Sequence, residues 1–174
     1  NFWNEVVKIN SWQQHRISKL IIQKLFGTLS GKKIAILGFA FKANTNDTRE
    51  SPAIQVCKDL IEEGANLMIH DPKVDPRQIR LELGLNPNEN EQKINEVERN
   101  SDGGWRFSED IYESFKNSDA CLILTEWDQY SVIDWNKASN IMRNPAWVFD
   151  TRLIADAKQV KNANLFYWRL GDGL

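Results

Sequence analysis

Two cations, Lys42 and Arg49, occupy the segment that follows an apolar run at residues 34–37. Ser51 and Pro52 then suit the start of a helix, because Ser accepts a backbone N–H there and Pro lacks one where none is needed. A loop between a strand and a helix is where α/β proteins hold phosphates. After its first residue this loop lacks the further glycines of a G-x-G-x-x-G fingerprint. We therefore predict an anion site built from side chains.

Besides Lys42 and Arg49, other residues that follow the expected strands should lie at the same edge of a parallel sheet, even when they are far apart in sequence. They are Phe41, Asp71, Thr125, Glu126, Trp127, Asp128, Asp150, Thr151 and Arg152. The cations and two aromatic residues on one edge suit a ligand that carries phosphates and a ring. Ion pairs are also common at such edges, so Lys42 and Arg152 could instead offset the acids gathered there.

Two of these positions allow a second interpretation. Arg49 precedes an expected helix N-terminus, where the helix dipole does not favour a cation. It therefore indicates either an anionic ligand or an ion pair with Asp47 or Glu50. Asp71 could hold a ribose, but Asp71-Pro72 is also an ordinary turn sequence, and we favour the turn.

Apolar runs alternate with amphipathic segments after residue 31. The expected strands cover residues 33–37, 66–70, 120–124, 147–149 and 165–168, and the expected helices cover residues 52–63, 76–83, 109–116 and 134–143. This alternation predicts an α/β fold, a Rossmann-like doubly wound parallel sheet. Gly64 should end the first of these helices.

A long N-terminal helix is predicted for residues 1–26, with Gly27 as its stop. We assign residues 1–28 to this helix and residues 29–174 to the Rossmann-like domain. Trp3 and Trp12 on the helix could anchor an interface or make ordinary core contacts. The polar stretch at residues 85–104 is predicted to be a solvated insertion.

Composition excludes several classes of protein. The net charge of −2 over 174 residues gives no cationic field for nucleic acid or an anionic membrane. No apolar run approaches the roughly 20 residues of a membrane span, and we expect a cytoplasmic protein. Cys57 and Cys121 lie in apolar patterns and should be buried and reduced. His15 and His70 have no ligand clustering, so no metal site is expected.

The motifs at the expected sheet edge resemble the C-terminal part of nucleotide-sugar dehydrogenases. The motifs are Gly38-Phe39-Ala40-Phe41-Lys42, Thr45, Asp47-Thr48-Arg49-Glu50-Ser51-Pro52, Asp71-Pro72-Lys73, Thr125-Glu126-Trp127 and Phe149-Asp150-Thr151-Arg152. The resemblance covers nearly the whole chain. The Phe-Ala-Phe-Lys and Thr-Glu-Trp forms are most similar to members that act on UDP-glucose. Other members act on GDP-mannose or on N-acetylated UDP sugars.

The resemblance implies a role for four residues. Phe41, Lys42 and Arg152 would contact the UDP-sugar, and Arg49 would reach NAD, which is held mainly by an N-terminal domain. The long helix would form a homodimer or a higher homo-oligomer.

The resemblance also implies what this chain lacks. The family oxidises UDP-glucose to UDP-glucuronate in two steps, through a nucleophilic Cys in a Gly-Gly-Ser-Cys-Phe type of segment. That segment is absent here, so we expect no catalytic residue in this chain, no activity for it alone, and a longer parent protein. The alternative from another class is a non-catalytic interaction module that assembles partners through the long helix.

Overall fold

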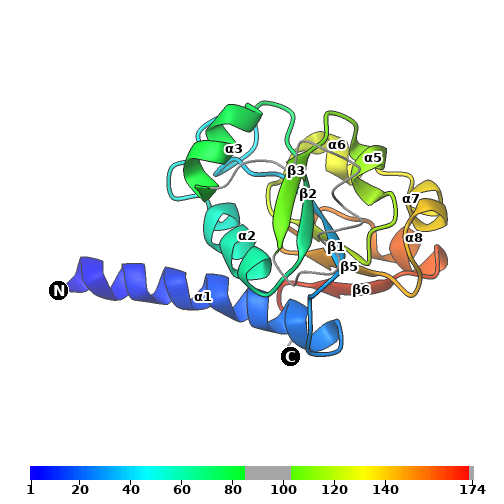
Figure 1. The fold of residues 1–174 in the computed structure, drawn as a ribbon, viewed down its shortest axis with the longest axis horizontal. Coiled ribbons are helices and arrows are strands. Elements are labelled where there is room, and N and C mark those ends of the chain that lie inside the picture. The colour runs from blue at the N-terminus through cyan, green and yellow to red at the C-terminus, as the bar shows by residue number, and fades with distance from the viewer. Residues whose placement is uncertain (85–102, 173–174) are drawn as a thin grey trace.

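The computed structural model describes residues 1–84 and 103–172 and contains one sheet of six parallel strands in the order β3-β2-β1-β4-β5-β6 (Figure 1). The strands are β1 (Lys33–Leu37), β2 (Asn66–His70), β3 (Gly104–Phe107), β4 (Ala120–Ile123), β5 (Trp147–Asp150) and β6 (Phe166–Arg169). The order reverses direction at β1 and β4, as in doubly wound nucleotide-binding folds. The predicted Rossmann-like class is confirmed.

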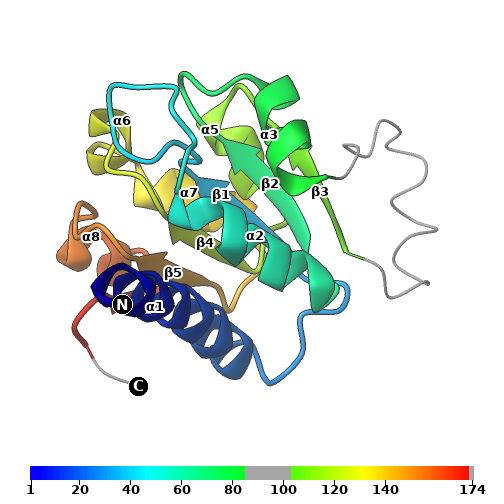
Figure 2. The ribbon, with the colours of Figure 1, turned by 90° about the vertical axis from the view of Figure 1, so that its left-hand side faces the viewer.

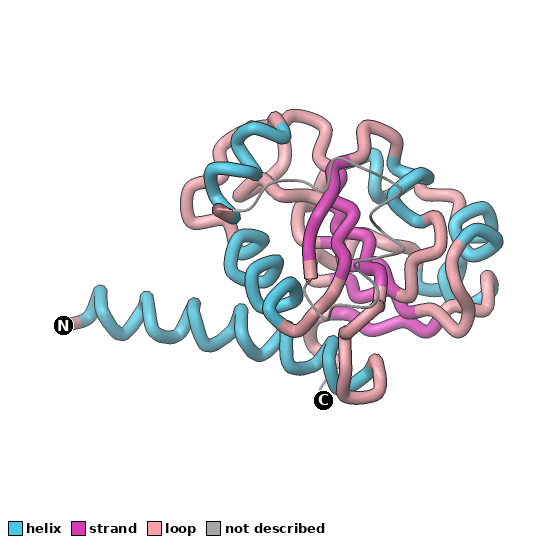
Figure 3. The backbone as a smooth tube through the Cα atoms, viewed as in Figure 1, coloured by secondary structure: helices cyan, strands magenta, loops and turns pink. Residues whose placement is uncertain are grey.

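Helices cover both faces of this sheet, which forms the central layer (Figure 3). They are α1 (Phe2–Lys24), α2 (Pro52–Glu62), α3 (Pro76–Leu83), α5 (Ile111–Phe115), α6 (Asp128–Ser131), α7 (Trp135–Ile141) and α8 (Ala157–Asn162). Helices α1, α2 and α3 lie on one side, and α5, α7 and α8 lie on the other (Figures 1 and 2). Both faces of β1 and β4 are therefore buried, which explains their continuous apolar sequences.

Side-chain caps set where five of the helices begin. Ser51 accepts a hydrogen bond from the backbone N–H of Ala53, and Pro52 follows it as predicted. Aspartates cap the other four in the same way: Asp75 for α3, Asp110 for α5, Asp134 for α7 and Asp156 for α8. Each cap satisfies an N–H group that the first turn leaves without a partner.

The predicted long helix is present, but only its second half packs on the domain. Leu20, Ile21 and Leu25 are buried in the core. The first turns extend past the rest of the molecule (Figure 1) and expose five large apolar residues. They are Phe2, Trp3, Val7, Ile9 and Trp12. Trp3 and Trp12 are therefore not core residues of the described structure.

Three short elements were not predicted. The missed elements are β3, α6 and α8, of four to six residues each. Gly104, which we assigned to the polar insertion, instead opens β3, and Trp105 in that strand is 1% exposed. So few residues show almost no periodicity, and packing against neighbouring elements decides their conformation. The rest of the expected insertion, residues 85–102, lies outside the described residues.

The remaining boundaries differ from the predictions by one or two residues. The N-terminal helix ends at Lys24, and both Phe26 and Gly27 have positive φ. Gly64 has a φ of 93° just past the end of α2, as predicted. Cys57 and Cys121 are buried and free, as predicted. Among residues 1–84 and 103–172, no helix is long and apolar enough to cross a membrane.

Candidate functional site

The first backbone N–H groups of the loop after β1, those of Phe39, Ala40 and Phe41, donate hydrogen bonds within the domain. Asp71 Oδ2 accepts hydrogen bonds from the N–H groups of Phe39 and Ala40 over 2.8 and 3.0 Å. The N–H of Phe41 donates to the carbonyl of Asp47 over 2.8 Å. In a dinucleotide-binding loop, groups at these positions would face a pyrophosphate. The N–H groups of these three residues are therefore engaged within the domain and do not face a ligand.

Asp71 organises this loop through hydrogen bonds to the protein itself. Its carboxylate accepts five hydrogen bonds, from the backbone N–H groups of Phe39, Ala40, Lys73 and Val74 and from the indole of Trp127. The turn interpretation is therefore correct, because the bonds from Lys73 and Val74 are those of a turn at Asp71. The carboxylate has no capacity left for a ribose.

Trp127 is not available as a platform for a ligand ring. Its side chain is 6% exposed, and its Nε1 donates to Asp71 Oδ2 over 3.2 Å. Our expectation that two aromatic residues would face a ligand at this edge was wrong for Trp127. A buried indole needs a partner for its N–H, and Asp71 provides it. Phe41, in contrast, is 45% exposed.

Gly38 brings the loops after β1 and β4 into direct contact. A Cβ at Gly38 would lie 2.3 Å from the Cβ of Thr125, and its φ is 95°. Thr125 Oγ1 in turn donates to the carbonyl of Ala40 over 2.8 Å. Glycine is required here because no other side chain fits between the two loops.

Arg152 is anchored at one end of its guanidinium. Its Nε donates to the carbonyl of Leu124 over 2.9 Å, and its backbone N–H donates to Asp150 Oδ1 over 3.0 Å. The side chain is 31% exposed. The terminal Nη1 and Nη2 groups make no hydrogen bond to any residue of the described ranges. A guanidinium fixed in this way presents two parallel donors, the arrangement that suits a phosphate.

Glu126 connects Arg152 to the loop that carries Lys42. Glu126 Oε1 accepts from the N–H of Ala43 over 3.3 Å, and Oε2 lies 3.5 Å from Arg152 Nε. Segments after β1, β4 and β5 therefore meet at one edge, as predicted. The alternative that acids offset the cations holds in part for Arg152. Lys42 is exposed, and it forms no ion pair within the part of the chain that the structure describes.

Arg49 forms the local ion pair that we left open as an alternative. Its Nε and Nη2 bind both oxygens of Asp47, with Nη2 to Oδ2 at 2.8 Å. These hydrogen bonds lower the pKa of Asp47 to about 2. The Arg49 side chain is 87% exposed. The pair is therefore accessible to solvent, and its contribution to stability is small.

The segment around Arg49 is tied to another part of the domain. The buried hydroxyl of Thr48 donates to Glu82 Oε1 over 2.9 Å and accepts from Gln78 Nε2 over 3.0 Å. Both partners belong to α3. The loop after β1 is thus held by Glu126 near Lys42 and by α3 near Arg49.

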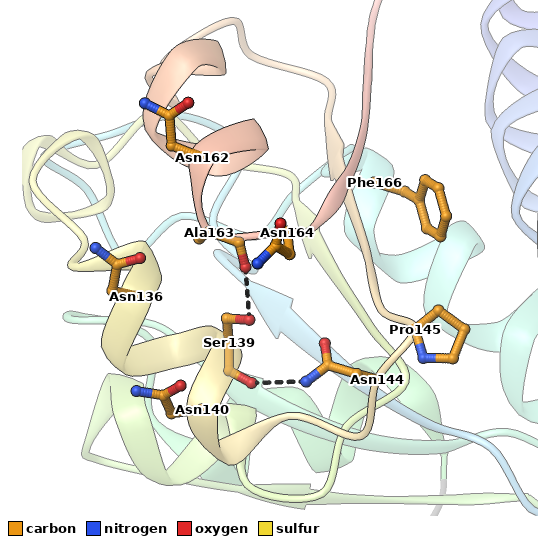
Figure 4. Close-up of a pocket in the computed structure, with 9 residues that line it drawn as sticks. All are labelled: Asn136, Ser139, Asn140, Asn144, Pro145, Asn162, Ala163, Asn164 and Phe166. Atoms are coloured by element: carbon orange, nitrogen blue, oxygen red, sulfur yellow. Dashed lines mark hydrogen bonds between the residues drawn. The ribbon is translucent and has the colours of Figure 1, made fainter.

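A cavity of about 620 Å³ lies at the opposite edge of the sheet (Figure 4). Its lining consists of Asn136, Ser139, Asn140, Asn144, Pro145, Asn162, Ala163, Asn164 and Phe166. Ser139 and Asn144 bond to backbone carbonyls in its wall, as Figure 4 shows. The lining carries no charged side chain and lies at the amino ends of β5 and β6. It therefore does not suit the anion predicted from the sequence.

Glu126 was among the residues predicted at the sheet edge, but its position between two loops was not predicted. Its two contacts require that β4 lie between β1 and β5. No single sequence motif specifies the strand order. The sequence signal was an acidic residue two positions past the apolar run at residues 120–124.

Comparison with known proteins gives consistent relatives. The sequence model described as "UDP-glucose/GDP-mannose dehydrogenase family, UDP binding domain" matches residues 35–157. UDP-glucose 6-dehydrogenase 1 of Glycine max is 39% identical over 175 residues, which are 99% of this chain and 36% of that protein. UDP-glucose 6-dehydrogenase of Drosophila melanogaster is 40% identical over 98% of this chain and 34% of that protein. The chain thus spans about a third of the length of these relatives.

Solved structures agree on the fold. A UDP-glucose dehydrogenase from Pyrobaculum islandicum superimposes with a TM-score of 0.63 and 26% identity, over 93% of this chain and 30% of that chain. An NDP-N-acetyl-D-galactosaminuronic acid dehydrogenase from Methanosarcina mazei has a TM-score of 0.67 at 20% identity, over 92% of this chain and 29% of that chain. The second similarity concerns the fold alone.

Proposed function

Because the chain belongs to the UDP-glucose/GDP-mannose dehydrogenase family, we propose that it is the UDP-sugar-binding domain of an NAD-dependent UDP-glucose 6-dehydrogenase. The names of the relatives from plants and Drosophila support UDP-glucose as the substrate. The chain covers about 36% of such relatives, so the two-step oxidation to UDP-glucuronate is proposed for the parent protein. No catalytic residue is assigned to this chain.

The observation that carries the proposal is the guanidinium of Arg152. Its Nε is bound to Leu124, and its terminal nitrogens have no partner among the described residues. Two donors held in one plane match two oxygens of a phosphate, and such charge-assisted bonds are stronger than neutral ones. We assign Arg152 to the diphosphate of the UDP-sugar.

Lys42 and Phe41 complete the proposed site. Lys42 is exposed on the segment that Glu126 ties to Arg152, so a second positive charge lies in the loop that faces the same edge. Phe41 is a large apolar side chain that is 45% exposed beside this cation. An exposed ring next to a phosphate-binding cation suits the nucleoside part of a nucleotide.

The residues of this chain do not fit a dinucleotide site of the Rossmann type. Asp71 and the carbonyl of Asp47 occupy the N–H groups of Phe39, Ala40 and Phe41 at the start of the loop after β1. We therefore propose that NAD, which accepts hydride in such dehydrogenases, is held mainly by a domain outside this chain. Arg49, exposed and paired only with Asp47 among the described residues, is the one proposed contact to it. An Arg49→Ala variant should then raise the KM for NAD more than the KM for UDP-glucose.

Helix α1 supports the proposed division of the chain. We assign residues 1–28 to a connecting helix and residues 29–174 to the nucleotide-sugar domain. The first half of α1 exposes Trp3 and Trp12 among other apolar residues. A helix with such a face needs a partner surface. We propose that it contributes to a homodimer or a higher homo-oligomer, and the mass of the full-length protein in solution tests this.

Binding and kinetics of the full-length protein test the site. Lys42→Ala and Arg152→Ala should each raise the UDP dissociation constant or the KM for UDP-glucose at least about tenfold, because each loses a charge-assisted bond worth about 1.5–3 kcal/mol. Arg143→Ala is the matched control. Arg143 precedes β5 and pairs with Asp119, which precedes β4, so the pair lies at the opposite edge of the sheet from Arg152. Unchanged affinity in both site variants would refute the assignment.

The alternative of a non-catalytic interaction module rests on the same exposed face of α1. It predicts concentration-dependent self-association without any response to UDP. Saturable UDP binding that Arg152→Ala abolishes would exclude it. Competition between UDP-glucose, GDP-mannose and an N-acetylated UDP sugar would show which nucleotide sugar the parent protein prefers.

A further inference from the structure

Glu126 places a carboxylate inside the edge that we assign to an anion. Its Oε2 is buried and accepts no hydrogen bond, and it lies 3.5 Å from Arg152 Nε. A negative charge in this place would repel a diphosphate unless it serves another purpose. A buried carboxylate oxygen without a hydrogen bond is also rare enough to need an explanation.

The sheet order explains what Glu126 reaches. Strand β4 lies between β1 and β5, so a side chain that follows β4 stands between the loops after those two strands. Each of its two carboxylate oxygens contacts one of these loops. Oε1 accepts from Ala43 in the loop of Lys42, and Oε2 faces Arg152 after β5. Glu126 thus links the two proposed ligand-binding segments.

Arg152 Nε has a second contact besides Glu126. That nitrogen also donates to the carbonyl of Leu124 over 2.9 Å. With a carbonyl and a carboxylate at Nε, the plane of the guanidinium is fixed and its terminal nitrogens remain available. Any loss of this restraint would leave a long side chain to be ordered by the ligand, which weakens binding.

We propose that Glu126 is a positioning residue that holds Arg152 and the Phe41–Lys42 segment in register for the diphosphate of a UDP-sugar. This inference rests on the proposed function, because it concerns how the same site is organised. It assigns to the Thr125-Glu126-Trp127 motif a role in binding that is distinct from the packing role of Trp127. The role requires both carboxylate oxygens, since each contacts a different loop.

Glu126→Gln in the full-length protein is the decisive variant. Glutamine keeps the size but offers a single acceptor oxygen, so it can serve Ala43 or Arg152 but not both. We expect the dissociation constant of UDP and the KM for UDP-glucose to rise about tenfold, with kcat within about twofold of the wild type. Glu126→Asp keeps the charge but is shorter, and we expect a partial loss of the same kind. The thermal midpoint should stay close to that of the wild type.

Asp128→Asn is the matched control for charge. Asp128 is exposed at the start of α6, two residues further on, and its carboxylate has no bond to the described residues. Its substitution should leave UDP affinity unchanged or slightly improve it. If Glu126→Gln also binds UDP as well as or better than the wild type, the carboxylate only repels the ligand and the proposal is wrong.

The double variant with Arg152→Ala separates the two hypotheses. If Glu126 acts in part through Arg152, adding Glu126→Gln to Arg152→Ala should cost less affinity than Glu126→Gln costs in the wild type, because the share exerted through Arg152 is already lost. A full additive loss would overturn the positioning role while leaving the UDP site intact. If Arg152→Ala and Lys42→Ala themselves leave UDP affinity unchanged, the proposed UDP site is wrong, whatever the result for Glu126.

Discussion

The indole Nε1 of Trp127 donates a hydrogen bond to Asp71 Oδ2 over 3.2 Å, and both side chains are buried. The two residues follow different strands, and the sequence suggested a ligand-facing aromatic residue for Trp127 and a turn for Asp71. They contact each other instead. The bond closes a network in which one carboxylate fixes the loop after β1, its own turn after β2 and the segment after β4.

Asp71→Asn should therefore destabilise the domain strongly. An amide places NH₂ against N–H donors at one of the two oxygen positions, so at least two bonds are lost and a repulsive contact is formed. We expect a loss of about 3 kcal/mol in the free energy of unfolding, measured by urea denaturation. Asp75→Asn, at the exposed cap of α3, is the control and should cost less than about 0.5 kcal/mol because Asn caps equally well. Equal effects of the two changes would contradict the role of Asp71.

Gly38→Ala should be among the most damaging small substitutions in this chain. The new methyl group would lie 2.3 Å from Thr125 Cβ and 2.8 Å from the Thr125 backbone nitrogen, at a φ of 95°. We expect a loss of more than about 3 kcal/mol, or failure to fold. Gly31→Ala has a φ of 72° but meets nothing within 4 Å, so it should cost only about 1 kcal/mol. Comparable losses would mean that backbone strain, and not the contact with Thr125, decides the outcome.

Neither cysteine should react with a thiol reagent in the native protein. Burial raises the pKa of the Cys57 thiol, and burial together with the nearby Asp150 charge raises the pKa of Cys121. The reactive thiolate is therefore scarce, and the sulfur atoms are inaccessible. Titration with a chromogenic disulfide should detect both thiols in denaturant and neither of them in buffer. Rapid labelling of either thiol under native conditions would disprove the prediction.

His70 should make stability fall as the pH is lowered below about 6.5. It is buried, and its Nδ1 lies 2.9 Å from the hydroxyl of Tyr130. Desolvation lowers the pKa of His70, although the charges of Asp71 and Asp110 oppose the shift. The imidazole of His70 then binds a proton more readily in the unfolded chain than in the folded protein. The contribution of His70 to stability is therefore complete above its unfolded pKa and is lost as the pH falls toward its folded pKa.

Urea denaturation of the wild type and of His70→Gln between about pH 8 and pH 5 measures this effect. The difference between the two stability curves isolates His70 from His15 and from the carboxylates. It should be largest above about pH 6.5 and shrink at lower pH. A constant difference over the whole range would show that the pKa of His70 is not lowered by folding.

Much of the fold followed from local sequence. The apolar run at residues 34–37 and the pair Ser51-Pro52 predicted a strand, a loop and a helix, and all three are present. The alternation of such units predicted the parallel sheet. Strand β3 and helix α8 were not predicted because each is short and acquires its conformation from the elements packed beside it. Local propensity is weak at that length.

The sequence by itself determined which residues stand at the carboxyl edge of the sheet, because parallel strands all end there. It also predicted an anion site built from side chains, because the loop after β1 lacks the glycines for a backbone site. Only the tertiary structure decided which side chains are already engaged. Asp71 is 32 residues from Phe39 and Glu126 is 83 from Ala43. Hydrogen bonds over such separations exist only once strand order and register are set, so no local pattern could distinguish the occupied groups from the available Arg152.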